Sequence, residues 1–235
     1  MNRNSALRWL APIEAAGLPI PRTLMIPYSH YDILPIFDGD SSEEFIRLKI
    51  AVEEAVSEIG PPAFLRTDLS SAKHSGPKSY LITNAAACGQ QVFDTLEDNE
   101  MKFFMQREGP QTMMVRQFLD LDSRFTAFDG LPIAREWRIF ADGEHVICKH
   151  PYWPKEALEG HVSSAGWEDQ LAEMHVYPED AGLEAMAIQA ARACVGEPWS
   201  VDFARDKSGK WWLLDMAVMA DSYHWTGCEK KGITQ

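Results

Sequence analysis

The sequence Trp199-Ser-Val-Asp202-Phe-Ala-Arg-Asp-Lys-Ser-Gly209-Lys-Trp-Trp-Leu-Leu-Asp215 predicts two short strands joined by a tight turn. Apolar residues alternate with small or acidic ones before the turn, and an apolar run follows it. One acid therefore lies inside the first strand, and another ends the second. Two carboxylates on one side of a hairpin repel each other unless a cation lies nearby. Mg²⁺ is usually held by one or two carboxylates plus substrate phosphates, so Asp202 and Asp215 are candidate ligands. Two solvated acids on an ordinary hairpin are the alternative.

The composition is typical of a globular enzyme. The 235 residues suffice for one large domain or two compact lobes. A net charge of −13 disfavours nucleic acid or anionic lipid as a partner. No apolar run approaches the roughly 20 residues that span a bilayer, and the four widely spaced cysteines indicate reduced thiols. We expect a cytoplasmic protein without a nucleic-acid or membrane partner.

Helical and strand patterns alternate without a βαβ repeat. Residues 41–59 have the clearest helical pattern, with Ser42 near the start and Gly60 at the end. Residues 1–60 are expected to form a small α/β unit that ends at two prolines. Further strands are expected over 63–67, 80–83, 113–119, 134–141 and 145–150, helices over 89–106 and 179–194, and polar loops over 68–79 and 155–177. The predicted fold class is α+β with largely antiparallel pairing.

The stretch Phe-Leu-Arg-Thr-Asp-Leu-Ser-Ser-Ala-Lys-His-Ser-Gly (64–76) places Arg66 on a strand and Lys73 in a serine-rich loop. A guanidinium and an ammonium with hydroxyls and amides between them suit a polyphosphate. The stretch has neither Walker spacing nor a glycine triplet, which excludes P-loop and Rossmann sites. A surface loop with two solvated cations is the alternative.

The stretch Met-Met-Val-Arg-Gln-Phe-Leu-Asp-Leu-Asp (113–122) is an apolar strand that becomes acidic as it ends. Backbone groups at such an end can read an adenine edge, and Asp120 or Asp122 can accept from ribose hydroxyls. A core strand followed by a turn is the alternative.

The stretch Ala-Arg-Glu-Trp-Arg-Ile-Phe (134–140) sends Arg135 and Arg138 to opposite faces of a strand. One arginine then points inward and needs an anionic partner. That partner is either a structural glutamate or a phosphoryl or acyl-phosphate group.

The last strand continues into Asp221, Ser222 and His224. Asp221 is a candidate metal ligand together with Asp215, and Ser222 and His224 are candidate substrate contacts. A hydrogen-bonded histidine without a functional role is the alternative for His224.

Taken in order, these pieces resemble the ATP-grasp fold over about residues 60–225. The resemblance is closest to the R-to-K clade of phage and bacterial proteins. The chain is also distantly similar to the eukaryotic cell-division-cycle chaperone that assembles translation initiation factor two. The resemblance implies a domain over 61–235, with lobes at about 61–118 and 119–235 and nucleotide held between antiparallel sheets.

The resemblance also implies roles for the residues quoted above. The phosphate-binding cations match Arg66 and Lys73, the arginines near the phosphoryl group match Arg135 and Arg138, and the magnesium carboxylates match Asp202 and Asp215. The adenine-binding hinge matches Arg116, Gln117, Phe118 and Leu119, and Asp122 is the candidate ribose contact beside it. Two residues depart from the family pattern. Arg66 stands where a lysine is usual. Ala217 stands where an asparagine usually binds the metal, and Asp221 is expected to supply the missing ligand.

Members of this fold are mostly ATP- and Mg²⁺-dependent carboxylate–amine ligases that form an acyl phosphate. The resemblance therefore implies ATP and Mg²⁺ as cofactors and small-molecule or peptide carboxylates and amines as substrates. It implies the cytoplasm, or a host's cytoplasm for a phage protein, and a long loop at 155–177 that closes over the site. An ATP-binding assembly chaperone or scaffold without ligase activity is the alternative.

Overall fold

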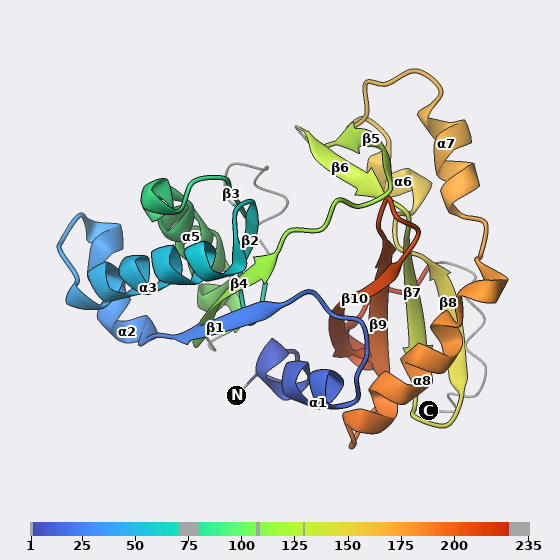
Figure 1. Cartoon of the computed structure of the whole chain (residues 1–235), viewed down its shortest axis with the longest axis horizontal. Helices are drawn as coiled ribbons and strands as arrows, with labels where there is room; N and C mark the ends of the chain where they lie inside the picture. The colour runs from blue at the N-terminus through green and yellow to red at the C-terminus, as the bar shows by residue number, and fades with distance from the viewer. Residues whose placement is uncertain (1, 71–79, 107–108, 129, 226–235) are drawn as a thin grey trace. The chain divides into compact units, whose positions relative to one another are not determined.

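The computed structural model describes residues 2–70, 80–106, 109–128 and 130–225 (Figure 1). Its contacts divide the chain into two compact units. The first unit contains Pro21–Phe118 with the first two residues, and the second contains Arg3–Ile20 and the chain from Leu119 onward. Each unit combines helices with a four-stranded antiparallel sheet. The class is therefore α+β.

The sheet of the first unit has the strand order β1-β4-β2-β3. The helices of this unit that pack against β2 or β4 include α3 and α5. The elements are β1 (Thr23–Pro27), α2 (His30–Ile33), η2 (Leu34–Asp38), α3 (Glu43–Ile59), β2 (Ala63–Thr67), β3 (Leu81–Ile82), η4 (Ala85–Ala87), α5 (Gly89–Gln106) and β4 (Thr112–Gln117).

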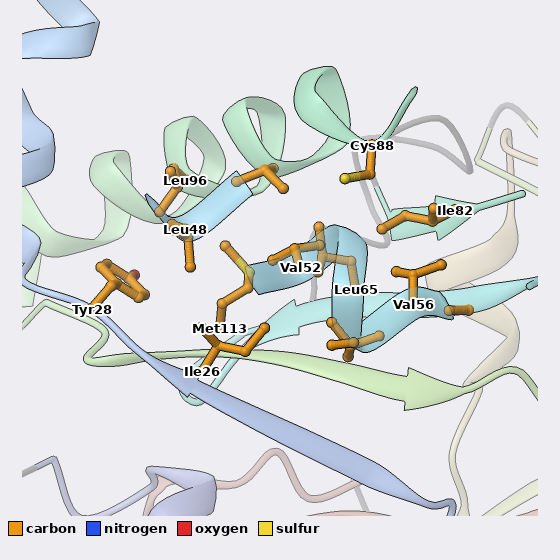
Figure 2. Packing of buried hydrophobic residues seen from close by; sticks show 14 of the residues in the cluster. Ile26, Tyr28, Leu48, Val52, Val56, Leu65, Ile82, Cys88, Leu96 and Met113 are labelled. Carbon is orange, nitrogen blue, oxygen red and sulfur yellow. The ribbon is translucent and has the colours of Figure 1, made fainter. Parts of the chain in front are cut away.

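One hydrophobic core joins the helices and the sheet of the first unit (Figure 2). Leu48, Val52 and Val56 recur every fourth residue along α3, so they form one apolar stripe on the helix. They lie in the same buried cluster as Leu65 of β2 and Met113 of β4. Each of these five side chains is 0% exposed, so α3 is fixed to the sheet by burial of its apolar face.

The observed division differs from the predicted unit over residues 1–60. Strand β1 pairs with β4, and α3 packs on β4, so residues 21–60 form one unit with the following 58 residues, 61–118. The helix α1 (Leu10–Ala15) instead packs against α8 of the second unit. The Pro61-Pro62 pair is thus a turn inside a unit and not its boundary.

The sheet of the second unit has the order β10-β9-β7-β8, and β5 and β6 form a separate two-stranded sheet. No helix in the described residues is both long and apolar enough to cross a membrane. The remaining elements are η1 (Ala6–Arg8), β5 (Ser123–Ala127), β6 (Leu131–Ala134), β7 (Glu136–Ala141), β8 (Val146–Pro151), α6 (Lys155–Leu158), α7 (Trp167–Met174), η5 (Glu179–Ala181), α8 (Leu183–Ala193), β9 (Trp199–Arg205), β10 (Trp211–Val218) and η6 (Met219–Asp221).

Helix α8 covers one face of this sheet. It packs against β7, β8 and β9. Lys149 of β8 pairs with Glu184 of α8, and the register partner of Lys149 is Ile139. Side chains alternate between the faces of a strand, so Arg138 and Phe140 point to the face opposite α8.

Two sequence-based expectations for this unit need correction. The segment 155–177 is not a plain loop, because it contains α6 and α7. The expected strand over 134–141 is split, since Ala134 ends β6 and Glu136 begins β7.

We expect Ser42→Ala to destabilise the first unit by about 1 kcal/mol, the usual cost of losing an N-cap. The Ser42 hydroxyl accepts from the amide of Phe45 at 3.1 Å and donates to the carbonyl of Asp32 at 2.7 Å. Hydrogen exchange of the α3 amides measures the loss. Ser57→Ala on the exposed side of α3 is the matched control and should change exchange by less than about 0.5 kcal/mol. Equal losses in both variants would contradict the capping role.

Candidate functional site

One row of polar side chains crosses the sheet of the second unit. Asp215 of β10 lies opposite Asp202 of β9 in the antiparallel register. Asp202 lies opposite Arg138 of β7, and Arg138 lies opposite His150 of β8. Directly opposed residues point to the same face. Two carboxylates, a guanidinium and an imidazole therefore share the face that α8 leaves uncovered.

The ion pair between Arg138 and Asp202 is bidentate and largely buried. Arg138 donates from Nε to Oδ1 and from Nη2 to Oδ2 of Asp202, both at 2.7 Å. The two side chains are 15% and 10% exposed. Burial lowers the pKa of Arg138, but the charge and hydrogen bonds of Asp202 outweigh burial and hold it above its ordinary value. Arg138 is therefore a fixed cation on this face.

Asp215 brings a second negative charge to the row. Its charge also raises the pKa of Arg138. Two carboxylates fit Mg²⁺, which takes one or two protein carboxylates and completes its shell with water and phosphate oxygens. The described residues contain no group of three or more acidic, histidine or cysteine side chains that could hold a metal ion. Phosphate or water oxygens would therefore have to supply the other ligands.

The segment after β10 crosses the same face. The Ser222 hydroxyl lies 2.6 Å from that of Ser200 on β9. The His224 ring stacks on Phe140 of β7, with 3.8 Å between centroids. Ser200 and Phe140 are each two residues from a member of the polar row, so they share its face. The predicted substrate contacts Ser222 and His224 thus lie on the face that carries the acids.

The rings of Trp225, His150 and His175 lie together at the His150 end of this face. Trp225 stacks on His150, with 5.4 Å between centroids, and meets His175 edge-on at 5.3 Å. His150 Nδ1 lies 2.7 Å from the carbonyl of Pro151, and since a carbonyl only accepts, Nδ1 carries the proton. Burial lowers the pKa of both His150 and His175. The two imidazoles therefore add no positive charge to the row at neutral pH.

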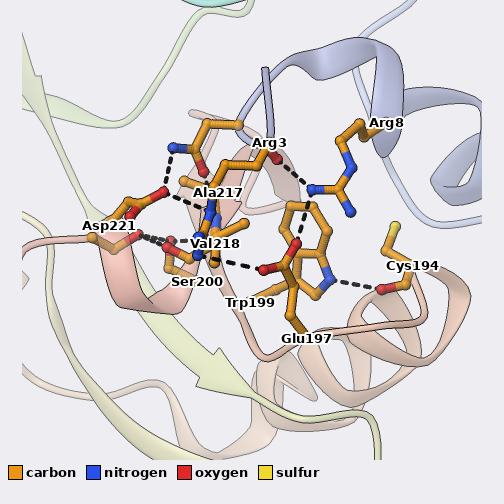
Figure 3. Close-up of polar contacts among 11 residues, drawn as sticks. Arg3, Arg8, Cys194, Glu197, Trp199, Ser200, Ala217, Val218 and Asp221 are labelled. Carbon is orange, nitrogen blue, oxygen red and sulfur yellow. Dashed lines mark hydrogen bonds and ion pairs between the residues drawn. The ribbon is translucent and has the colours of Figure 1, made fainter. Parts of the chain in front are cut away.

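Asp221, the predicted third metal ligand, has other partners (Figure 3). Arg3 Nε lies 3.0 Å from Asp221 Oδ2, and Asn4 Nδ2 donates to the same oxygen at 2.8 Å. Within the described residues, Asp221 forms no metal-binding group with Asp202 and Asp215. Asp221 Oδ2 is thus already paired with residues near the N-terminus, and the role of Asp221 as a third metal ligand stays a prediction.

Arg135 lies one residue before β7, and its contacts are not with the acidic row. Its Nη2 donates to the carbonyl of Glu173 at 2.7 Å, and its Nε is buried without a hydrogen-bond partner. Burial, and then the charge of Arg205, lowers the pKa of Arg135. The structure therefore does not bring the two predicted catalytic arginines together, and Arg138 alone joins the acids.

Arg66, one of the two predicted phosphate-binding cations, lies on β2 of the first unit. Arg66 is only 5% exposed, and its Nε donates to the carbonyl of Thr67 at 3.0 Å. Its burial contradicts the alternative of a solvated surface cation. Lys73 lies outside the described residues. The assignment of both residues to phosphate stays a prediction.

The predicted hinge begins at the end of β4. Arg116 is 4% exposed, and the Gln117 amide donates to the carbonyl of Arg22 at 2.8 Å. Phe118 is the last residue of the first unit, and the chain enters the second unit at Leu119. Their contact with adenine stays a prediction.

Asp122, the predicted ribose contact, already pairs with cations. Arg124 Nε lies 3.2 Å from Oδ1, and Arg205 Nη1 lies 3.6 Å from Oδ2. A ribose hydroxyl would share this carboxylate with two guanidinium groups. The role of Asp122 also stays a prediction.

Two residues that contact or face Arg138 were absent from the sequence-based site. Tyr152 places its ring under Arg138, with 4.8 Å from Cζ to the ring centroid, and His150 lies opposite Arg138. The signal was the two neighbouring strands predicted over 134–141 and 145–150, whose register decides which residue of β8 faces Arg138. Register depends on the turn and the bulge at Ala141, which local patterns do not define.

Comparisons with protein-family models and with curated proteins find no match. Among solved structures, the chain is similar to a RimK-domain ATP-grasp protein from Sphaerobacter thermophilus, with 14% identity over 93% of this chain and a TM-score of 0.46. It is similar to the ATP-grasp ligase PsnB in complex with a minimal precursor, with 15% identity over 98% of the chain and a TM-score of 0.44. It is also similar to an L-amino acid ligase from Bacillus licheniformis, with 12% identity over 92% and a TM-score of 0.45.

The chain spans 60%, 56% and 42% of these three structures, respectively. Two of the three carry the ATP-grasp name, which is the fold that the sequence resembles. At such TM-scores and identities, the likeness assigns neither activity nor substrate to this chain.

We expect the second unit to lose stability between pH 7.5 and pH 5.5. The folded pKa values of His150 and His175 are lowered, so the unfolded chain binds protons that the folded chain does not. Their contribution is complete above the unfolded pKa and is lost as the pH falls toward the folded one. The loss is at most about 1.4 kcal/mol per histidine for each pH unit. Urea unfolding followed by tryptophan fluorescence measures it, because all eight tryptophans lie in the second unit.

The matched control for this measurement is His145, an exposed histidine of the same unit. His150→Gln and His175→Gln should each reduce the pH dependence, and His145→Gln should leave it unchanged. The same pH dependence in all three variants would show that the buried imidazoles do not cause it.

Proposed function

We propose that this protein is an ATP- and Mg²⁺-dependent ligase that joins a carboxylate to an amine. The observation that carries the proposal is the row Asp215–Asp202–Arg138 on one sheet face. Two acids and one arginine can hold a divalent cation and an anionic group beside each other. The resemblance of the sequence to ATP-grasp proteins supplies the reaction class.

A purely structural ion pair between Arg138 and Asp202 would explain these two residues but not Asp215. A buried arginine needs one carboxylate, and Asp202 already provides two short hydrogen bonds to Arg138. Asp215 adds a second acid directly opposite Asp202, and like charges in that position destabilise a sheet. Two neighbouring carboxylates are the protein ligands that a Mg²⁺ site would use.

In the proposed mechanism, Asp202 and Asp215 would hold the metal. Bound Mg²⁺·ATP would supply the phosphoryl group that converts a carboxylate into an acyl phosphate and would neutralise charge on the phosphates. Arg138 is the residue positioned to stabilise the anionic acyl phosphate while the amine attacks it. Ser222 and His224, which lie on the same face, are proposed to contact the substrate.

A nucleotide-binding chaperone or scaffold is the second candidate. Ala217 stands where ATP-grasp enzymes have an asparagine ligand, and the described residues offer no three-ligand metal group. A site with fewer protein ligands favours nucleotide binding over phosphoryl transfer. Release of ADP by the purified protein, and its acceleration by a pool of amino acids or peptides, separates the two candidates in favour of the ligase.

We expect ATP with Mg²⁺ to raise the melting temperature of the protein. At an ATP concentration of about 100 times the dissociation constant, the free energy of unfolding should rise by roughly 2.7 kcal/mol, because the ligand binds only the folded state. Asp215→Asn should abolish ADP release but retain part of this thermal shift, since the metal loses a charged ligand while other nucleotide contacts remain.

Two variants control for general effects of removing an acid. Asp180→Asn changes an exposed acid of the same unit and should keep full ADP release. Asp221→Asn should also retain turnover, because Asp221 pairs with Arg3 and Asn4. Wild-type ADP release from Asp215→Asn, or no thermal shift of the wild type by two independent probes, would count against the proposed site.

A further inference from the structure

Arg138 lies in the polar row between Asp202 on one side and the neutral imidazole of His150 on the other. Its two bonds of 2.7 Å use one lone-pair direction on each oxygen of Asp202. A metal bound to Asp202 would bring two further positive charges beside this guanidinium. At such separations like charges repel strongly, and most strongly in a largely buried site. Arg138 and a divalent cation therefore compete for Asp202.

Arg138 has partners that do not depend on Asp202. Its Cζ lies 4.8 Å from the centroid of the Tyr152 ring, a cation–π distance. Its Nη1 lies 3.5 Å from the carbonyl oxygen of Tyr223, in the segment that crosses the face. These contacts can keep the guanidinium on this face after its bonds to Asp202 break.

We infer that Arg138 is the resident counter-cation of the Asp202–Asp215 pair, and that a divalent metal replaces it on Asp202 and releases it to an anionic substrate group. This inference rests on the proposed function, because it takes the acid pair as the metal site. The inference adds a coupling between metal binding and phosphate binding. A phosphate that accepts the released guanidinium raises the affinity for the metal, and the metal raises the affinity for the phosphate by the same factor.

The first consequence concerns the metal alone. Without nucleotide, Mn²⁺ must displace Arg138 before it can use both oxygens of Asp202. Arg138→Met removes the competing charge and keeps an unbranched apolar side chain. We expect this variant to bind Mn²⁺ about tenfold more tightly than the wild type, which is equivalent to one hydrogen bond between charged groups. A merely structural Arg138 predicts unchanged or weaker Mn²⁺ binding.

The second consequence concerns the coupling. ADP should raise the Mn²⁺ affinity of the wild type by a larger factor than that of Arg138→Met, because only the wild type has an arginine to transfer. Calorimetry or electron paramagnetic resonance with Mn²⁺, with and without ADP, measures both affinities. Arg135→Met is the matched control, since Arg135 bonds the carbonyl of Glu173, and it should match the wild type.

Removal of Arg138 leaves Asp202 buried without its counter-ion, so Arg138→Met can unfold. Arg138→Lys keeps a charge but loses the bidentate geometry, and it should give a Mn²⁺ affinity between those of the wild type and Arg138→Met. If Arg138→Met unfolds, a Mn²⁺ affinity of Arg138→Lys above that of the wild type supports the inference, and an equal or lower one overturns it.

The outcomes separate this inference from the proposed function. Tighter Mn²⁺ binding by the variants, with no ADP release by the wild type, supports the counter-cation and contradicts the ligase. ADP release by the wild type with unchanged Mn²⁺ affinity in the variants contradicts the counter-cation alone. Absence of Mn²⁺ binding in every variant, with and without ADP, contradicts both.

Discussion

A bidentate ion pair between Arg138 and Asp202 joins the two inner strands of the second unit's sheet. Its constraint is electrostatic, since a carboxylate on an inner strand with 10% of its side chain exposed needs a positive partner. Removal of either partner would leave an uncompensated charge. The alignment of β7 with β9 is therefore tied to this pair, and so is the position of Asp215 beside it.

The same pair gives the site its chemical character. Arg138 remains charged at all accessible pH values, whereas the neighbouring imidazoles of His150 and His175 are neutral at pH 7. The row thus has two negative groups and one positive group, with neutral rings over one end. Neutral cover costs less than buried charge, and it adds no positive charge that would repel the proposed cation. Stability and the proposed metal binding depend on the same residues.

The sequence could predict the features that depend on local chemistry. Ser42 and Gly60 delimit α3 because caps act on neighbouring amides and carbonyls. Asp202 and Asp215 could be predicted to face the same side of a hairpin because one short turn joins their strands. The bulge between Leu213 and Asp215, which sets the two acids directly opposite each other, could not be predicted. Asp221 could not be placed, since its partners Arg3 and Asn4 are far away in the chain.

Long-range pairing explains the other differences. Strand β1 belongs with β4 and not with a unit of its own, and no local pattern encodes that partner. The hairpin of β5 and β6 was not predicted, although residues 129–130 are Asp-Gly, a common turn sequence.

The most direct test of the site is a crystal structure with ADP and Mn²⁺, in which anomalous scattering locates the metal. The account predicts a peak about 2.1 Å from carboxylate oxygens of both Asp202 and Asp215, with Arg138 turned away from Asp202. Bound ADP with its metal elsewhere, and Arg138 still on Asp202, would contradict it.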